Sequence, residues 1–178
     1  MHFLRTEHPE VVIIKPFVFN DYRGSFMESY NIDKFRAGGI SVEFVQDNYV
    51  KSIKNTLRGL HFQTSHPQAK LLRCLKGKIF DVAVDIRKDS SFYGKWVGME
   101  LSEQNNDMLY IPEGFAHGYY VMSENAEVSY KCSNIYYPEF NESIIWNDPE
   151  IGIDWPCEIP ILSEKDKKAP TLKEFSIS

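Results

Sequence analysis

Apolar and polar positions alternate with a period of two along much of the chain, which is the pattern of strands that bury one face. The cleanest strand is predicted for residues 79–87, where Phe80 and Val82 alternate with Asp81 and Ala83. A helix is disfavoured in this segment, because a helical face repeats roughly every 3.6 residues.

Short segments of this kind recur along the chain and are separated by turn-forming residues. Strands are predicted at Val11–Ile14, Ser25–Tyr30, Val42–Val50, Arg58–Gln63, Ala69–Leu75, Ile79–Arg87, Trp96–Leu101, Met108–Ile111, Tyr119–Met122 and Val128–Cys132. A hairpin turn is expected at Lys76–Lys78. One short helix is predicted for Ile32–Ala37, because Asn31 can cap its start and Gly38 can end it. After Tyr137 the chain is expected to be irregular.

About ten short strands with little helix indicate an all-β fold, either an antiparallel sandwich or a barrel. We expect a double-sheet jelly roll with short peripheral helices. The length of 178 residues suits a single domain spanning 1–178. Folds of this kind hold ligands in the mouth or the interior of the barrel.

Composition agrees with this expectation and narrows the function. The chain has 12 Phe, 10 Tyr and 3 Trp, residues that favour strands. Its formal net charge of -5 argues against nucleic-acid binding, which needs a basic surface. Three widely spaced cysteines suit a reducing compartment, and no apolar run resembles a signal peptide or a membrane span. We therefore expect a cytoplasmic protein without membrane contact.

The stretch Arg58–Gln63 places a guanidinium, an imidazole and an amide on one predicted strand. Arginine is suited to phosphate, because its planar fork donates two parallel hydrogen bonds. Histidine side chains exchange protons near neutral pH. Strand alternation would direct His61 and Gln63 to the same face. Such a polar face calls for a metal, a substrate or solvent.

A second informative stretch is Pro112–Gly118, in which a tight turn presents His117 at the start of the next strand. Together with His61 it resembles the cupin superfamily, whose PxGxxH motif supplies a metal-binding histidine. Cupin metal sites usually add a His-x-His pair, but here Gln63 stands in the second position. Two imidazoles and an amide are poor ligands for zinc or iron. We therefore expect a metal-free cupin whose histidines do acid–base work. For His117 alone, a hydrogen-bonded turn histidine is the competing interpretation.

Four further side chains have two possible interpretations each. Lys70 lies on an apolar strand, where it could extend to solvent or stabilise an oxyanion. Tyr130 could be a packing residue or a proton donor. Asp81 and Asp85 share a strand face and could be solvated or could orient a histidine.

Six segments of the chain, in this order, resemble segments of a known protein family. They are RGLHFQ, QAKLLRCLKGKIFDVAVDIRKDSSFYGKW, YIPEGFAHGYYV, SYKCSNIYYPE, WNDPEIGIDWP and ILSEKD. Together they closely resemble the dTDP-4-dehydrorhamnose 3,5-epimerase family over nearly the whole chain. The resemblance implies a jelly-roll homodimer that acts on a dTDP-sugar without a metal or other cofactor, whereas the residues alone indicate only a diphosphate.

The resemblance also implies roles for individual residues. It assigns the general base to His61 with Asp166, the proton donor to Tyr130, and a place beside the keto oxygen to Lys70. Further substrate-contacting positions, some reaching across the dimer, are Phe19, Arg23, Glu28, Gln46, Asp47, Asn48, Arg58, His117, Tyr136 and Lys165. Where the family commonly has an acidic residue this chain has Asn141, and Glu142 could substitute for it with a shift of one residue.

This set of residues suits epimerisation at the two carbons beside a ketone. The keto group acidifies those protons because loss of one leaves an enolate, and inversion needs a base on one face and an acid on the other. Three alternatives stay open at this point. They are a single-centre epimerase or ketoisomerase of the same fold, a metal-dependent cupin, and a sugar-binding module without activity.

Overall fold

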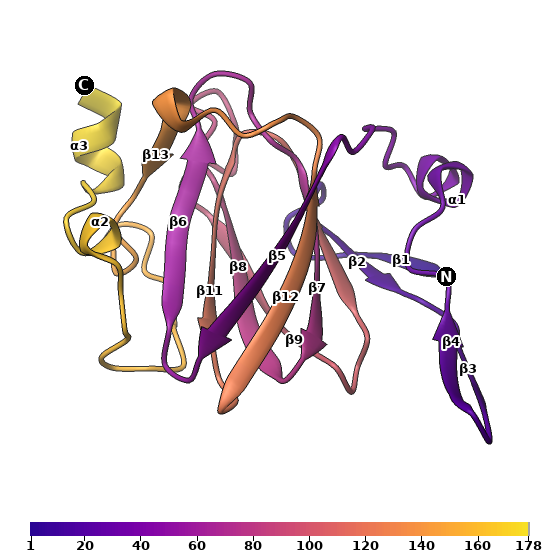
Figure 1. The fold of residues 1–178 in the computed structure, drawn as a ribbon. Coiled ribbons are helices and arrows are strands. Elements are labelled where there is room, and N and C mark those ends of the chain that lie inside the picture. The colour runs from indigo at the N-terminus through magenta and orange to yellow at the C-terminus, as the bar shows by residue number, and fades with distance from the viewer. Residues whose placement is uncertain (178) are drawn as a thin grey trace.

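The computed structural model describes the backbone of residues 1–177 and the side chains of residues 1–175. Within this part of the chain, two antiparallel sheets pack as a jelly roll, which confirms the predicted all-β fold (Figure 1). One sheet has the order β1 (His2–Arg5), β2 (Val12–Lys15), β10 (Met108–Ile111), β7 (Lys70–Lys76), β12 (Asn125–Cys132) and β5 (Gln46–Ile53). The other has the order β13 (Asn141–Ser143), β6 (Leu57–Gln63), β11 (Phe115–Val121), β8 (Lys78–Asp85) and β9 (Trp96–Ser102).

Short elements surround the two sheets. A separate hairpin consists of β3 (Val18–Asp21) and β4 (Gly24–Met27), and the helices are α1 (Ile32–Ala37), the 3-10 turn η1 (Pro138–Phe140), α2 (Glu164–Lys167) and α3 (Leu172–Ile177). No helix in the described residues has both the length and the apolar character needed to cross a membrane.

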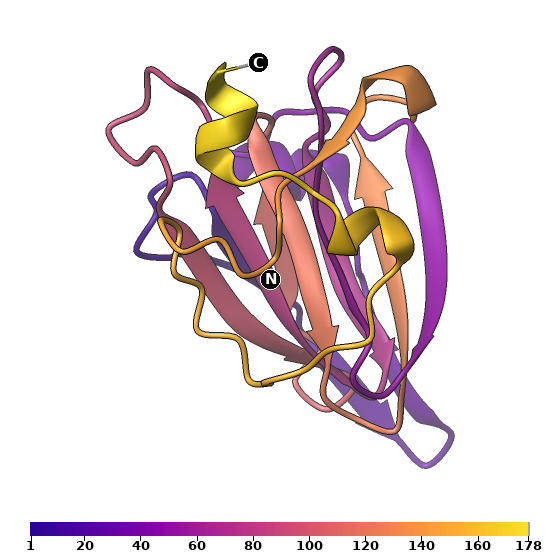
Figure 2. The ribbon, with the colours of Figure 1, turned by 90° about the vertical axis from the view of Figure 1, so that its left-hand side faces the viewer.

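The core fills the space between the two sheets. Leu72 and Val128 enter it from the six-stranded sheet, and Ile79 and Ala83 enter it from β8 of the five-stranded sheet; all four are almost fully buried. The opposite face of β8 is buried as well, because the C-terminal segment with α3 lies over it (Figure 2). The period of two therefore identified β8 correctly, although both of its faces are covered.

Helix α1 has the bounds that the sequence predicts. The Asn31 side chain accepts hydrogen bonds from the backbone N–H groups of Asp33 and Lys34, and Gly38 caps the other end. The helix buries Phe35 against Ile14 on the outer face of the six-stranded sheet. This element could be predicted because its start and end depend on neighbouring residues alone.

The hairpin expected at Lys76–Lys78 is wrong. Strand β7 pairs with β10 and β12, whereas β8 pairs with β9 and β11, so the turn carries the chain from one sheet to the other. Gly77 sits at this corner with φ 75°, and a Cβ atom there would lie 2.1 Å from the carbonyl oxygen of Asn125. Glycine is required at this corner because of the close approach and the positive φ.

Several strand ends also differ from the prediction. The strand expected at Val42–Val50 begins only at Gln46, because Val42 and Phe44 pack beside α1 instead of pairing. The strand expected at Ser25–Tyr30 ends at Met27. The strand expected at Tyr119–Met122 begins four residues earlier, because β11 spans Phe115–Val121. The elements β1, β3, β13, α2 and α3 were not predicted, since three to six residues are too few to show a period.

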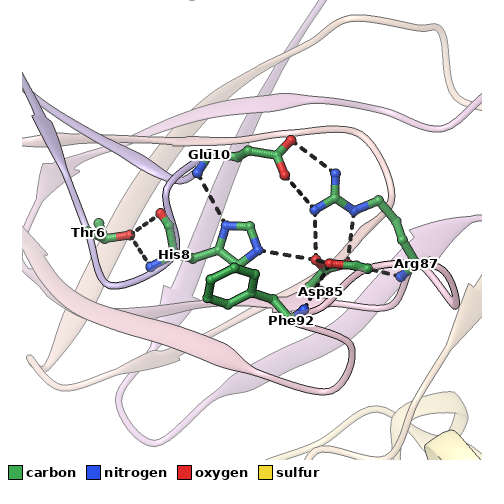
Figure 3. Close-up of polar contacts among 7 residues, drawn as sticks. Thr6, His8, Glu10, Asp85, Arg87 and Phe92 are labelled. Carbon is green, nitrogen blue, oxygen red and sulfur yellow. Dashed lines mark hydrogen bonds and ion pairs between the residues drawn. The ribbon is translucent and has the colours of Figure 1, made fainter.

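One buried ion network ties the N-terminal loop to the end of β8 (Figure 3). His8 Nε2 lies 3.1 Å from Asp85 Oδ2, and Arg87 donates hydrogen bonds to both Asp85 and Glu10. Burial alone would raise the pKa of Asp85, but hydrogen bonds from Arg87, Ser90 and His8 hold that pKa well below its usual range. Asp85 is fully buried, so the solvated reading is wrong and the carboxylate does orient a histidine.

Candidate active site between the two sheets

A cavity of about 410 Å³ opens between the two sheets. The strands that contribute to its lining are β5, β7 and β12 of the six-stranded sheet and β6, β11 and β13 of the five-stranded sheet. Figure 1 shows where these strands lie. The lining residues are Gln46, Asn48, Val50, Arg58, His61, Gln68, Lys70, His117, Tyr119, Tyr130, Tyr136 and Asn141. Polar and titratable side chains therefore face one another inside an otherwise apolar sandwich.

An irregularity in β6 brings Arg58 and His61 to the same cavity. His61 pairs with His117 and Arg58 pairs with Tyr119, so three steps along β6 match two along β11, and the Gly59-Leu60 peptide is cis. Regular alternation would place residues three apart on opposite faces. Gly59 allows the close approach of the two strands, because a Cβ atom there would lie 2.6 Å from the Gly118 Cα.

His61 and Asp166 form a close pair at the cavity wall. His61 Nε2 lies 2.6 Å from Asp166 Oδ1, and Asp166 is 3% exposed. The backbone N–H of Asp166 donates to the Ser163 hydroxyl, which caps α2 and fixes the helix beside β6. Burial alone would raise the pKa of Asp166, but the hydrogen bond with His61 holds the net pKa below its usual value. An imidazole that donates from Nε2 keeps Nδ1 free as a proton acceptor.

A second pair lies next to the first. His117 Nε2 is 3.0 Å from Asp81 Oδ2, and both side chains are buried. Burial lowers the pKa of His117, and the neighbouring Asp81 offsets this only in part. His117 therefore lies within β11 and lines the cavity while its ring contacts Asp81. Because Asp81 is fully buried, the interpretation that it is solvated is wrong.

The six-stranded sheet supplies Lys70 and Tyr130. Lys70 is 8% exposed and lines the cavity, which excludes the reading that it extends to bulk solvent. Burial lowers the pKa of the Lys70 ammonium, opposed by Cys132 and Asp81. Burial also raises the pKa of Tyr130 to about 12, so its phenol keeps its proton at neutral pH.

Three positions expected to bind substrate lie at the cavity with their own polar contacts. The Gln46 Oε1 accepts from the Tyr136 backbone N–H at 2.8 Å, and Gln46 Nε2 donates to Asn48 Oδ1 at 3.1 Å. Arg58 Nε donates to the Ser52 hydroxyl at 3.0 Å. Asn141, at the position where an acidic residue was expected, also lines the cavity, and Glu142 does not.

The sequence analysis missed Tyr119, the next cavity-facing residue after His117 on β11. It is 3% exposed, and its hydroxyl has no hydrogen-bond partner of good geometry within the described residues. Strand alternation alone could have found it, because residues two apart share a face. Its hydroxyl is available to a ligand.

Five of the expected substrate-contacting positions do not line this chain's own cavity. Phe19 and Arg23 lie on the β3–β4 hairpin, which projects away from the two sheets (Figure 1). Glu28 is paired with Lys34 beside α1. Asp47 is paired with Lys131, and a fifth position, Lys165, donates to the backbone carbonyl of Asn141 at the cavity rim.

Metal-ligating side chains do not gather in the part of the chain that the structure describes. No three of its His, Cys, Asp and Glu side chains are placed together so that they could hold a metal ion. Gln63, which stands where a second cupin histidine would be, points its amide into neighbouring loops and not into the cavity.

A jelly roll with two His–Asp pairs, a buried lysine and a protonated tyrosine around one interior cavity defines an enzyme of the cupin fold class. The family model described as dTDP-4-dehydrorhamnose 3,5-epimerase matches residues 5–174. The chain belongs to this family of isomerases.

Individual relatives agree with this assignment. The dTDP-4-dehydrorhamnose 3,5-epimerase of Salmonella typhimurium is 53% identical over 177 residues, covering 98% of this chain and 97% of that protein. A crystal structure of the 3,5-epimerase from Legionella pneumophila in complex with dTDP-4-keto-L-rhamnose has a TM-score of 0.94 at 45% identity, covering 97% of this chain and 93% of the other. A 3'-monoepimerase from Streptomyces bikiniensis in complex with dTDP-quinovose has a TM-score of 0.91 at 30% identity, covering 99% and 90%.

Proposed function

We propose that this protein epimerises dTDP-4-dehydro-6-deoxy-D-glucose at carbons 3 and 5 to dTDP-4-dehydro-L-rhamnose, in dTDP-L-rhamnose biosynthesis. One observation carries the proposal. His61 with Asp166 reaches the cavity from the five-stranded sheet, and Lys70 and Tyr130 reach it from the six-stranded sheet. A sugar held between the sheets therefore has a base on one side and an acid on the other.

In the proposed first step His61 removes the proton from the carbon beside the ketone. The electron pair of the C–H bond moves to the carbonyl, whose oxygen becomes an enolate oxygen. Asp166 stabilises the resulting imidazolium and fixes the orientation of the ring, the same use of a carboxylate as in a Ser-His-Asp triad. Its lowered pKa keeps it ionised for this role.

In the proposed second step Tyr130 returns a proton to the opposite face of the same carbon. Lys70 stabilises the enolate oxygen in the interval, since a preorganised donor in a dry site stabilises developing charge. His117 lies close to Lys70 and His61, and their charges add to the larger effect of burial in lowering the pKa of His117. After each epimerisation His61 releases its proton to solvent and Tyr130 takes one from solvent, which restores both groups for the next carbon. The scheme consists of proton transfers alone and changes no oxidation state.

The nucleotide diphosphate is proposed to occupy the outer part of the cavity. Arg58 offers a guanidinium to a phosphate, and Gln46 and Asn48 offer amides. The half-exposed ring of Tyr136 offers an apolar wall at the rim. The Tyr119 hydroxyl, which has no hydrogen-bond partner of good geometry within the described residues, offers one further hydrogen bond to the sugar.

We further propose a cytoplasmic homodimer in which the β3–β4 hairpin of each subunit completes its partner's site. Phe19 and Phe26 on this hairpin are 65% and 70% exposed, which is unusual for large aromatic side chains. Arg23 and Phe19 are expected substrate contacts, yet they face away from their own cavity. A second copy of the chain would reconcile these two observations.

This arrangement predicts complementation between inactive variants. Arg23→Ala and His61→Asn homodimers should each be weakly active, whereas a purified mixed dimer should regain one working site. That site combines His61 of one subunit with Arg23 of the other. Turnover of the mixed dimer, isolated with two different affinity tags, is the measurement. A mixed dimer as inactive as its parents would show that Arg23 does not act across subunits.

Product analysis in deuterated water tests the reaction itself. Proton NMR should show solvent deuterium at carbons 3 and 5 of the dTDP-sugar and formation of the L-rhamno ketone. Similarity to the 3'-monoepimerase supports the second candidate, a single-centre epimerase, for which exchange would be confined to one carbon. Binding of the dTDP-sugar without any exchange would contradict both proposals.

A further inference from the structure

Gln63 is buried beside the cavity without lining it, and its side-chain amide makes three contacts with backbone. Its Nε2 donates to the carbonyl oxygen of His66 at 2.7 Å and to that of Ile135 at 3.3 Å. Its Oε1 accepts from the backbone N–H of Tyr137 at 2.7 Å. The amide therefore holds the residues on both sides of Tyr136.

The segment held in this way has no strand or helix of its own. Residues 133–137 connect β12 to η1, and several of their backbone groups form hydrogen bonds with side chains in place of a strand partner. Gln46 accepts from the N–H of Tyr136, and Gln68 Nε2 donates to the carbonyl oxygen of Asn134 at 2.7 Å. Gln63 differs from these two because it is 6% exposed and does not line the cavity.

We propose that Gln63 is a positioning residue that sets substrate affinity by holding Tyr136 as the nucleotide-side wall of the cavity. The inference rests on the proposed function for the identity of the ligand. Gln63 contacts none of the proposed proton-transfer groups, so its removal should change binding and not chemistry. The amide thus fixes the shape of the cavity rim at the position where a metal-dependent cupin would carry a histidine.

A near-isosteric substitution, Gln63→Met, removes all three contacts. The affinity for dTDP, measured by titration calorimetry, should fall about tenfold, the effect of one to two net hydrogen bonds. The KM for the dTDP-sugar should rise in parallel, and kcat should stay within about twofold because ground-state and transition-state binding are weakened alike. Gln104→Met, at an exposed turn, is the matched control and should bind dTDP like the wild type.

A double-mutant cycle shows whether Gln63 acts through Tyr136. Tyr136→Ala should itself weaken dTDP binding, and adding Gln63→Met in that background should cause little further loss. Residues that act through one another are strongly non-additive. Additive losses would overturn the inference, because they would mean that Gln63 affects affinity by another route.

Gln63→Glu provides a second test, because its effect on dTDP affinity should depend on pH. A residue with only a structural role would not produce this pH dependence. Its ionised carboxylate still accepts from Tyr137 but repels the carbonyl oxygens of His66 and Ile135. Once protonated, the carboxyl has one O–H that can donate to the nearer of these carbonyl oxygens, that of His66, and it no longer carries the repelling charge. Its dTDP affinity relative to wild type should therefore recover as the pH falls. A ratio that does not change with pH would also overturn the inference.

The outcomes separate this inference from the proposed function. Wild-type protein that binds dTDP but does not turn over the dTDP-sugar would contradict the proposed function. The double-mutant cycle of Gln63 and Tyr136 would still test the inference, because it measures dTDP binding alone. Wild-type protein that turns over normally, together with a Gln63→Met variant of unchanged dTDP affinity and KM, would contradict the inference alone.

Discussion

Replacing His61 by Asn should lower the rate of deuterium incorporation at both carbons of the dTDP-sugar by roughly 10²–10⁴-fold, the usual contribution of a general base. Asparagine keeps a polar group near Asp166 but has no nitrogen that can take a proton near neutral pH. Loss at both carbons is expected, because the cavity holds one imidazole paired to a helix-borne carboxylate. The affinity for dTDP should change little.

The control for this experiment is His2→Asn, a substitution of the exposed histidine on β1. It should exchange deuterium at the wild-type rate. NMR of the substrate in deuterated water follows both carbons in the same sample. If His61→Asn kept normal exchange, His61 would not be the base, and the proposed mechanism would lose its first step.

Replacing Lys70 by Met should lower kcat by roughly 10²–10³-fold, the effect measured for loss of one oxyanion donor. The same substitution should leave thermal stability unchanged or raise it. Lys70 is 8% exposed, and burial lowers the pKa of its ammonium group, so the folded protein carries the cost of a desolvated cation. Methionine has a similar length and carries no such cost.

The expected result for Lys70→Met is therefore a lower kcat together with an unchanged or higher unfolding temperature. Thermal unfolding and kcat should be measured on the same preparations at neutral pH. Lys76→Met, at the exposed end of the same strand, is the matched control and should alter neither quantity. A Lys70→Met variant that lost stability and kept its kcat would mean that Lys70 supports the fold and not the reaction.

Local features of the fold were predictable from the sequence. Helix α1 has the predicted bounds because Asn31 and Gly38 cap it through contacts within a few residues. Strand β10 also has its predicted bounds, Met108–Ile111, since a short apolar run is ended by Pro112. The alternation along β8 identified it as a strand because side chains two apart share a face in any sheet.

Pairing between distant segments was not predictable in this way. The turn at Lys76–Lys78 resembles a hairpin locally, but its two strands enter different sheets. Which sheet a strand joins depends on partners far along the chain, and a turn of three residues carries no information about them. The offset in β6 has the same origin, because it exists only relative to β11.

The candidate site residues show the same contrast between what the sequence predicts and what depends on the tertiary structure. The residue types at His61, Lys70, His117 and Tyr130 suggested proton transfer, and the family resemblance suggested Asp166 as a partner. Tyr119 and the role of Gln63 emerged only from the structure, since a free hydroxyl and a loop-holding amide are defined by their surroundings. Phe19 and Arg23 were suggested by resemblance, and the structure places them on a hairpin outside their own cavity.

By itself, then, the sequence determined the strand-rich fold class, the capped helix and the residue types available for catalysis, because these depend on periodicity and on near neighbours. Only the tertiary structure decided which residues face one another. Asp166 meets His61 across 105 positions of the chain, and Asp81 meets His117 across 36. Such contacts form when two sheets close around one interior, and the free energy of that closure comes from the whole core and not from any local segment.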